Sequence, residues 1–188
     1  MVLNDVLIEE LCLISPYEPS LQSGNSYDCR WSGKYLAPRP EWVNMGEMEM
    51  LSIMMELERY PEQWEELKKT FWTDPIEKDF LILKPGDFVI MDTIEYFRFP
   101  SNICGQLLLK SSPARLGFNH ALAGWFDAGH PGFHGTATLE VANWSKWPLM
   151  LRKGQPFVQM VFHECYPPAV GYDKKGNYNG QDKPQPAK

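Results

Sequence analysis

Several features that would point to particular functions are missing from this 188-residue sequence. None of its four cysteines, Cys12, Cys29, Cys104 and Cys165, forms a C-x-x-C pair, so neither a zinc knuckle nor a dithiol redox motif is visible. No apolar run approaches the ~20 residues that span a bilayer, and Asp5 comes too early for a secretory signal. We therefore expect a cytoplasmic protein with reduced thiols and no membrane association.

An excess of positive charge is also missing. The chain has 18 Lys and Arg against 24 Asp and Glu, a net charge of −6, which disfavours a nucleic-acid partner. Local basic residues can still hold a small phosphate ligand. The hydrophobic content of 44% is enough for the core of one globular domain.

Short apolar or alternating runs dominate the chain from residue 80 onward. Gly, Pro, Asn or Asp bounds each of them, as is typical of strands joined by turns. The predicted strands are 80–84, 88–99, 103–109, 136–143, 147–155 and 156–164, with an earlier one at 25–31. A short helix at 6–13, capped by Asn4 or Asp5, is predicted before them. Many short strands favour a sandwich or a closed barrel.

Residues 46–72 carry helical periodicity instead. Apolar residues recur at helical spacing on both sides of Pro61, namely Met48, Leu51 and Met55 before it and Trp64, Leu67 and Phe71 after it. This pattern predicts a helical hairpin inserted into a β protein. Such an insert either caps one end of the core or contacts a partner or another subunit.

A cluster of hydrogen-bond donors follows the predicted strand 103–109. Lys110, Ser111, Ser112 and Arg115 lie in a predicted turn closed by Gly117. Hydroxyls, backbone N–H groups and a guanidinium are the donors that phosphate oxygens favour. The alternative is a serine-rich turn with a surface arginine.

Two carboxylates further along are candidates for chemistry. Glu140 is the only charged residue within Ala137–Ala142, and a charge inside an apolar strand is costly unless it has partners or a task. In a pocket, burial would raise its pKa and suit it to act as a general base; the alternative is a solvent-facing strand residue. Asp127 is either a sugar contact or an Asx-turn residue before Gly129.

The end of the chain, from Tyr166 onward, is rich in Pro, Gly, Lys and Asn and has no core pattern. Its Tyr172, Lys175, Tyr178 and Gln181 suit a lid that folds over a charged ligand. The alternative is a solvated basic tail. The H-x3-H spacing at His130 and His134 lies in a Gly/Pro loop without a third ligand nearby, so no protein-bound zinc is predicted.

In combination, these segments resemble the dCTP deaminase family, which is related to the trimeric dUTPases. The matching segments are 13–16, 24–28, 85–100, 110–117, 120–129, 138–143, Gly154 with Gln159, and 176–186. The resemblance covers the chain except for residues 40–75. It implies a mainly β, dUTPase-like distorted jelly roll or β-barrel, with a short N-terminal helix and the helical insertion near residues 46–72. Residues 1–165 would form one domain, and 166–188 a flexible C-terminal lid over the nucleotide.

The chain departs from the family pattern at three places. The turn between Gly117 and His120 is one residue short, and the loop after Asp127 carries about three extra residues around His130-Pro131-Gly132. Asn177 stands where the family usually has lysine. These differences touch sugar and phosphate contacts and leave the catalytic positions unchanged.

The resemblance implies a zinc-independent mechanism with Glu140 as general base. Glu140 would deprotonate a water held by Ser111 and the Ala123 carbonyl, with Arg115 in support, and the hydroxide would attack C4 of cytosine. Substrate binding would fall to Lys110, Ser112, Asp127, Phe133, Thr138, Gln159, Tyr172, Lys175, Tyr178 and Gln181. Mg²⁺ would be bound through the triphosphate and not by protein ligands. The partners implied are dCTP or dUTP and two further copies, in a homotrimer with shared active sites.

We expect deamination of dCTP to dUTP and ammonia in pyrimidine deoxynucleotide metabolism. The alternatives are a bifunctional dCTP deaminase and dUTP diphosphatase that yields dUMP, a dUTPase, or a non-catalytic nucleotide-binding regulator. Gly124 and Trp125 look more like the bifunctional branch, whereas the insertion near His130 points the other way. Glu140, Ser111 and Arg115 argue against a regulator, since binding alone needs no general base.

Overall fold

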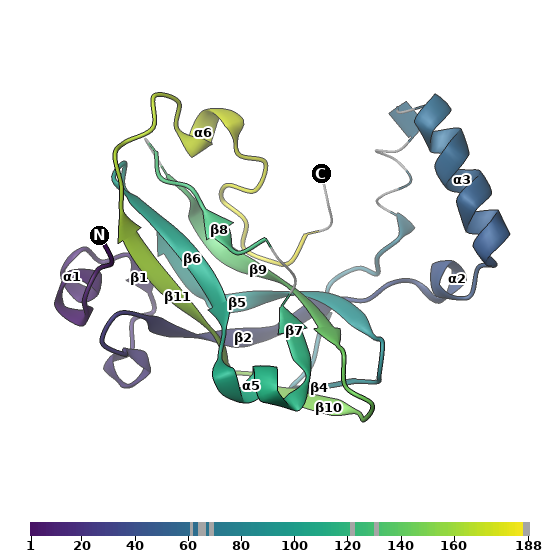
Figure 1. Cartoon of the computed structure of the whole chain (residues 1–188), viewed down its shortest axis with the longest axis horizontal. Helices are drawn as coiled ribbons and strands as arrows, with labels where there is room; N and C mark the ends of the chain where they lie inside the picture. The colour runs from purple at the N-terminus through teal and green to yellow at the C-terminus, as the bar shows by residue number, and fades with distance from the viewer. Residues whose placement is uncertain (61, 64–66, 68–69, 121–122, 130–131, 186–188) are drawn as a thin grey trace.

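The computed structural model describes residues 1–60, 62–63, 67, 70–120, 123–129 and 132–185. Within these residues an antiparallel sheet runs in the order β7-β9-β5-β2-β11-β6-β8, with β1 added to β5 and β3 added to β2 (Figure 1). A second sheet pairs β10 with β4. The strands are β1 (Ile14–Ser15), β2 (Tyr27–Leu36), β3 (Ile76–Glu77), β4 (Phe80–Leu83), β5 (Phe88–Arg98), β6 (Ile103–Leu109), β7 (Phe118–His120), β8 (Trp125–Phe126), β9 (His134–Asn143), β10 (Leu149–Arg152) and β11 (Pro156–Glu164). The expectation of a mainly β protein is confirmed.

Alternating side chains build the core. Along β2, Tyr27, Cys29 and Trp31 are fully buried while the residues between them are partly exposed, as the two-residue period of a strand requires. β4 and β10 turn one face, including Leu81 and Leu151, into the same core. The predicted strands 103–109 and 156–164 are confirmed as β6 and β11, and the predicted strand 25–31 continues to Leu36.

The helices lie outside the sheet. They are α1 (Asp5–Glu10), the 3-10 turn η1 (Pro19–Leu21), α2 (Pro40–Val43), α3 (Glu47–Arg59), α5 (Ser111–Leu116) and α6 (Tyr172–Lys175). Asn4 caps α1 by accepting a hydrogen bond from the Leu7 N–H at 3.1 Å. The predicted helix 6–13 is too long, because Ile14 enters strand β1 opposite Phe97 and the chain must leave the helix before it.

The donor cluster at 110–117 folds as helix α5 and not as the predicted turn. Pro113 lies in the first turn of the helix, where a missing backbone N–H is not needed. Gly117 ends the helix in the left-handed region, with φ of 101°, which glycine adopts without a Cβ clash. The serines and Arg115 are therefore presented on a short helix at the lower edge of the molecule (Figure 1).

The inserted segment projects from the body as an arm, formed by α2 and α3 (Figure 1). Acidic Glu47 and Glu49 in the first turn and Arg59 in the last turn of α3 suit the helix dipole. No α3 side chain that the structure describes is buried, so α3 does not cap the core. The predicted second helix falls largely outside the described residues. The chain returns to the body at Trp72, which bridges Pro38.

The end of the chain packs on the sheet, although its composition predicts no core contact. Gln181 pairs with Gly135 in an isolated bridge, and the Thr136 N–H donates to the Gln181 carbonyl at 3.0 Å. Gln181 and Pro184 are buried. No helix among the described residues is long and apolar enough to cross a membrane.

Candidate active site

Glu140 lies in the middle of β9. Its side chain is on the face of the strand opposite to the one that packs into the core. Its cross-strand partner is Ile90 of β5, and Leu139 and Val141 on either side are fully buried. Among the described residues, Glu140 Oε2 is buried without a hydrogen-bond partner. Burial raises the pKa of Glu140 from 4.5 to about 7. A carboxyl group with this pKa can both take up and return a proton near neutral pH.

A cavity of about 360 Å³ opens beside Glu140. It gathers six further residues that the sequence predicts for the site, from β9, the loops around β8 and the tail: Ala123, Phe133, Thr138, Tyr172, Tyr178 and Gln181. This volume suits a small organic ligand. The structure thus gathers half of the predicted site residues, Glu140 included, in one cavity whose carboxylate has one oxygen without a partner among the described residues.

Asp127 lies in an adjoining cavity of about 340 Å³, which Tyr172 and Lys175 also line. The Trp125 indole N–H donates to Asp127 Oδ1 at 3.0 Å. Because Trp125 and Tyr172 line both cavities, the two form neighbouring parts of one recess. Phe133 packs edge to face on Tyr172, with ring centroids 5.9 Å apart, and joins the tail to this wall.

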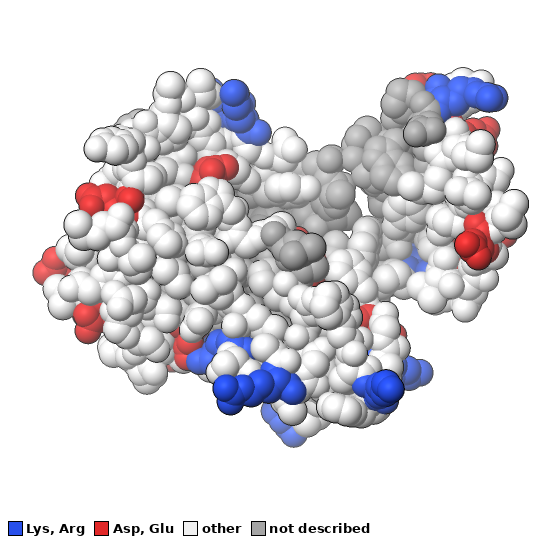
Figure 2. Space-filling model, viewed as in Figure 1, with Lys and Arg blue, Asp and Glu red and all other residues white. Residues whose placement is uncertain are grey.

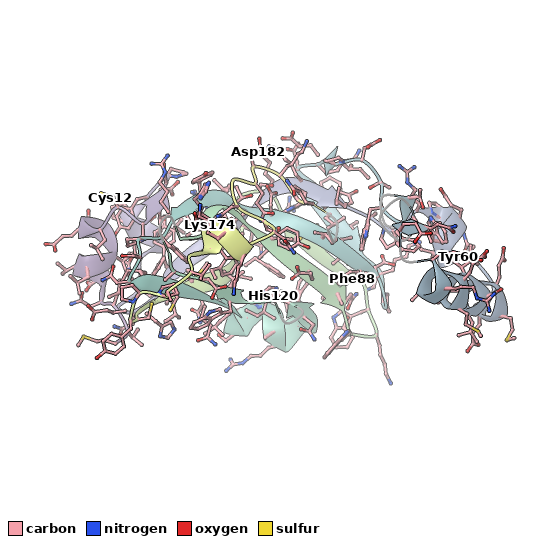
Figure 3. All side chains as sticks on the ribbon, turned by 90° about the horizontal axis from the view of Figure 1, so that it is seen from above. Cys12, Tyr60, Phe88, His120, Lys174 and Asp182 are labelled. Atoms are coloured by element: carbon pink, nitrogen blue, oxygen red, sulfur yellow. The ribbon has the colours of Figure 1, made fainter. Side chains whose placement is uncertain are left out.

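The tail is held against β9 next to Glu140. Gln181 Nε2 donates to the Thr136 carbonyl at 2.7 Å and to Thr138 Oγ1 at 2.8 Å. In Figure 3, Lys174 and Asp182 mark the tail lying over the sheet. The predicted lid segment therefore covers one side of the Glu140 cavity.

The predicted phosphate residues are not part of this cavity. Ser111, Ser112 and Arg115 on α5 are exposed and do not line either recess. Lys110 forms an ion pair with Asp28 of β2, and Gln159 of β11 is the cross-strand partner of Asp28. These five predicted residues form a second group on and beside α5. Within a single chain, this group does not line the Glu140 cavity.

The structure adds lining residues that were missed in the sequence. The remaining residues that line the Glu140 cavity are Trp72, Phe88, Ile90, Trp125, Phe126 and Gln185. Ile90 could have been found by pairing the strand 88–99 with the strand that carries Glu140. Trp72 could not, because it ends the insert that the family resemblance does not cover.

His120 of β7 lies beside the recess, in a third cavity that Gly124 and Trp125 also line. Among the described residues, both of its ring nitrogens are buried without a partner. Burial lowers the pKa of His120 to about 4, so the ring is neutral at physiological pH. The predicted H-x3-H pair cannot be compared, because His130 lies outside the described residues. Those residues contain no group of three or more His, Cys, Asp or Glu side chains arranged to hold a metal ion.

Comparisons with known proteins identify relatives of this chain. A family model described as dCTP deaminase-like matches residues 3–165. This chain belongs to the dCTP deaminase-like family. A relative from Methanoregula boonei named "dCTP deaminase, dUMP-forming" is 32% identical over 173 residues, which cover 92% of this chain and 84% of the relative. A protein of the same name from Mycobacterium tuberculosis is 36% identical over 124 residues, 63% of this chain and 64% of its own length.

A solved structure supports the fold of this family member. The 2'-deoxycytidine 5'-triphosphate deaminase from Agrobacterium tumefaciens superposes with a TM-score of 0.60 at 16% identity. The match covers 87% of this chain but 48% of that protein, so this chain spans about half of the solved one. At this identity the likeness concerns the fold alone. The dUTPase-like architecture expected from the sequence is confirmed.

Proposed function

We propose that this protein deaminates dCTP at C4 of cytosine and carries the reaction on to dUMP. The observation that carries the proposal is the Glu140 carboxylate, which faces a ligand-sized cavity with one oxygen unpartnered among the described residues. A binding protein would gain nothing from a buried carboxylate without a partner, because its desolvation is costly. A hydrolytic deaminase needs this group as a proton carrier.

Glu140 serves as base and then as acid. It takes a proton from a water seated against the Ala123 carbonyl, and the resulting hydroxide attacks C4. Glu140 returns this proton to N3. It then takes the proton of the new C4 hydroxyl and passes it to the amine, which leaves as ammonia while the C4 carbonyl of uracil forms. A pKa near 7 suits both steps, because the carboxylate and the acid are both populated at neutral pH. Zinc-independence of this step is part of the proposal.

The residues that the family resemblance assigns to water binding and charge support come from another copy. Ser111 and Arg115 of α5 are exposed and lie outside the Glu140 cavity of their own chain. A homotrimer with threefold symmetry would bring the α5 of a neighbour to each cavity. Lys110, Ser112 and Gln159 beside α5 would then bind the phosphates of the nucleotide in the neighbour's site.

The deoxyribose would bind in the recess beside Asp127, and the tail would close over it. Asp127, held by Trp125, would accept the 3'-hydroxyl, and Phe133 and Thr138 would line the base and sugar. Residues 166–188 would act as the lid on the 1–165 domain, with Tyr172, Lys175, Tyr178 and Gln181 closing over the nucleotide. Mg²⁺ would be held through the triphosphate oxygens, the ligands that a hard cation prefers, since the described residues form no metal-binding cluster.

Support for the final product comes from the names of the relatives and not from the geometry of the site. Sequence alone favours release of dUTP, with dUMP as the alternative. Two relatives above 30% identity are named dUMP-forming, which supports the alternative. The overall reaction would consume dCTP and two waters and release dUMP, ammonia and pyrophosphate.

The test is to incubate the purified protein with dCTP, dUTP and dCMP and to resolve the products by chromatography. The proposal expects dUMP, with pyrophosphate and ammonia released in equal amounts from dCTP. Ammonia with accumulating dUTP and no pyrophosphate would reduce the function to deamination alone. Unchanged dCTP would contradict the proposal.

A further inference from the structure

The arm helix α3 exposes a stripe of large apolar side chains to solvent. Met48, Leu51 and Met55 follow one another at positions i, i+3 and i+7, so they line one face of the helix. They are 76%, 51% and 65% exposed. Each is more than half exposed, and a contiguous exposed stripe of this kind marks a contact surface.

A second apolar surface lies at the lower edge of the body. We call it the basal face and define it by six exposed side chains: Phe80, Ile82, Leu116, Trp144, Trp147 and Met150. Met150 is the cross-strand partner of Ile82, and the Trp144 N–H donates to the Gly117 carbonyl at 2.9 Å, which joins the segment before β10 to the end of α5. Trp144 is 75% exposed.

The charges around the two surfaces are opposite. Glu47, Glu49 and Glu56 are exposed on α3. Lys84, Lys146 and Arg152 are exposed around the basal face, and Figure 2 shows basic side chains gathered along this lower edge. An acidic helix with an apolar stripe therefore complements a basic face with an apolar centre.

The arm also starts at the place where a neighbouring copy would meet the active site. Trp72, at the return of the arm, lines the Glu140 cavity, and in Figure 3 Phe88 of the same wall lies between the tail and Tyr60 on the arm. A neighbour that brings Arg115 to this cavity also brings the adjacent Leu116. The basal face of that neighbour would then lie on the side of the cavity from which the arm projects.

From this placement we propose that α3 of one copy docks on the basal face of the neighbouring copy whose α5 completes its site. The inference rests on the shared active site proposed above. The arm is thus an assembly element that holds the catalytic interface closed. Its apolar stripe supplies the contact, and the flanking charges select the face and the orientation.

Substitution of the stripe tests the contact. Met48→Gln, Leu51→Gln and Met55→Gln together remove the apolar stripe but retain residues that favour helix. We expect the concentration at which the oligomer half dissociates, measured by analytical ultracentrifugation, to rise at least tenfold. The matched control replaces exposed residues on α1 and at its C-cap, Val6→Gln, Leu7→Gln and Leu11→Gln, and should leave this concentration unchanged. Unchanged dissociation of the arm variant, with intact circular dichroism, would overturn the proposal.

Charge reversal tests the face. Glu49→Lys with Glu56→Lys on the arm, or Lys146→Glu with Arg152→Glu on the basal face, should each weaken the oligomer, and all four together should restore it. Failure of the combination to restore association would show that the arm does not dock on this face.

Measurements of activity separate this contact from the shared active site. The arm variants should retain deamination at protein concentrations high enough to restore the oligomer, whereas a wrong shared-site model would appear as failed complementation between Glu140→Gln and Ser111→Ala chains.

Discussion

Gln181 donates a hydrogen bond to Thr138 Oγ1 at 2.8 Å, two residues before Glu140 on the same strand. This bond, and a second one to the Thr136 carbonyl, tie the end of the chain to the strand that carries the proposed base. The position of the tail and the geometry of the candidate site are therefore linked through the side chain of Gln181, which is 3% exposed.

Replacement of Gln181 should loosen the tail without removing the base. Gln181→Ala deletes two hydrogen bonds from a buried position, and we expect the KM for dCTP to rise about tenfold, with a smaller change in kcat. Limited proteolysis should cut residues 166–185 faster. Asp182→Ala, at an exposed neighbouring position, is the control. Equal protection and equal KM in Gln181→Ala and the parent would contradict the role of the tail.

Deamination should depend on the ionisation of Glu140. Because burial raises the pKa of this carboxyl to about 7, the base form is lost as the pH falls below neutrality. The rate should rise between pH 5.5 and 7 and level off above it. A rate independent of pH across this interval would show that a group with another pKa performs the step.

The same pKa predicts a stability difference of defined sign. Between about pH 4.5 and 7 the folded protein retains a proton on Glu140 that the unfolded chain has released, so this group's contribution to the free energy of unfolding falls as the pH rises. Glu140→Gln has no such dependence and should gain stability relative to the parent from pH 5 to pH 8. Urea denaturation of both proteins at several pH values measures the difference. A difference that does not change with pH would contradict the raised pKa.

Two inactive chains should restore activity in each other. Glu140→Gln lacks the base and Ser111→Ala lacks the water contact, but in a trimer with shared sites a mixed interface can combine an intact copy of each. An equimolar mixture after subunit exchange should recover up to about a quarter of the parent rate, as random cyclic assembly allows. Light scattering should give roughly three times 21.7 kDa. A mixture as inactive as its components would place all catalytic groups in one chain.

Helix α5 should depend on Gly117. A Cβ at this position would lie 2.6 Å from Ser145 Cβ, and φ is 101°. Gly117→Ala should therefore lower the free energy of unfolding by about 1–2 kcal/mol or more. Gly24→Ala, where a Cβ would meet nothing within 4 Å, is the control. Equal stability of the two variants in urea denaturation would contradict the strained conformation at Gly117.

Strand positions were largely predictable from the sequence, because burial on a sheet alternates with a period of two. The same alternation places Glu140 and Thr138 on one face of their strand. The helix at α5 was missed, since its serines and Pro113 are typical of turns and only their position just before Gly117 indicates a helix end. The arm was predicted as helical, but nothing in its periodicity shows whether it folds onto the core or away from it.

The separation of the two groups of site residues could not be predicted from one chain. Sequence motifs name Ser111, Arg115 and Glu140 without stating which copy supplies each. Trp72 was missed for a related reason: it joins the cavity wall at the return of the insert, a tertiary arrangement that leaves no local pattern. Phe88 lies two residues before Ile90 on β5, so the same strand pairing could have found it.

The central claim is that Glu140 is the proton carrier of cytosine deamination. The most direct test measures ammonia release from dCTP by Glu140→Gln, with dCTP affinity determined by calorimetry in the same preparation and Glu9→Gln on α1 as the control. We predict a loss of about a thousandfold in rate with affinity retained within a few-fold, because general acid–base groups contribute roughly 10²–10⁴ to the rate and phosphate contacts dominate binding. Ammonia release within about tenfold of the parent, equivalent to less than ~1.4 kcal/mol of barrier, would remove Glu140 from the mechanism.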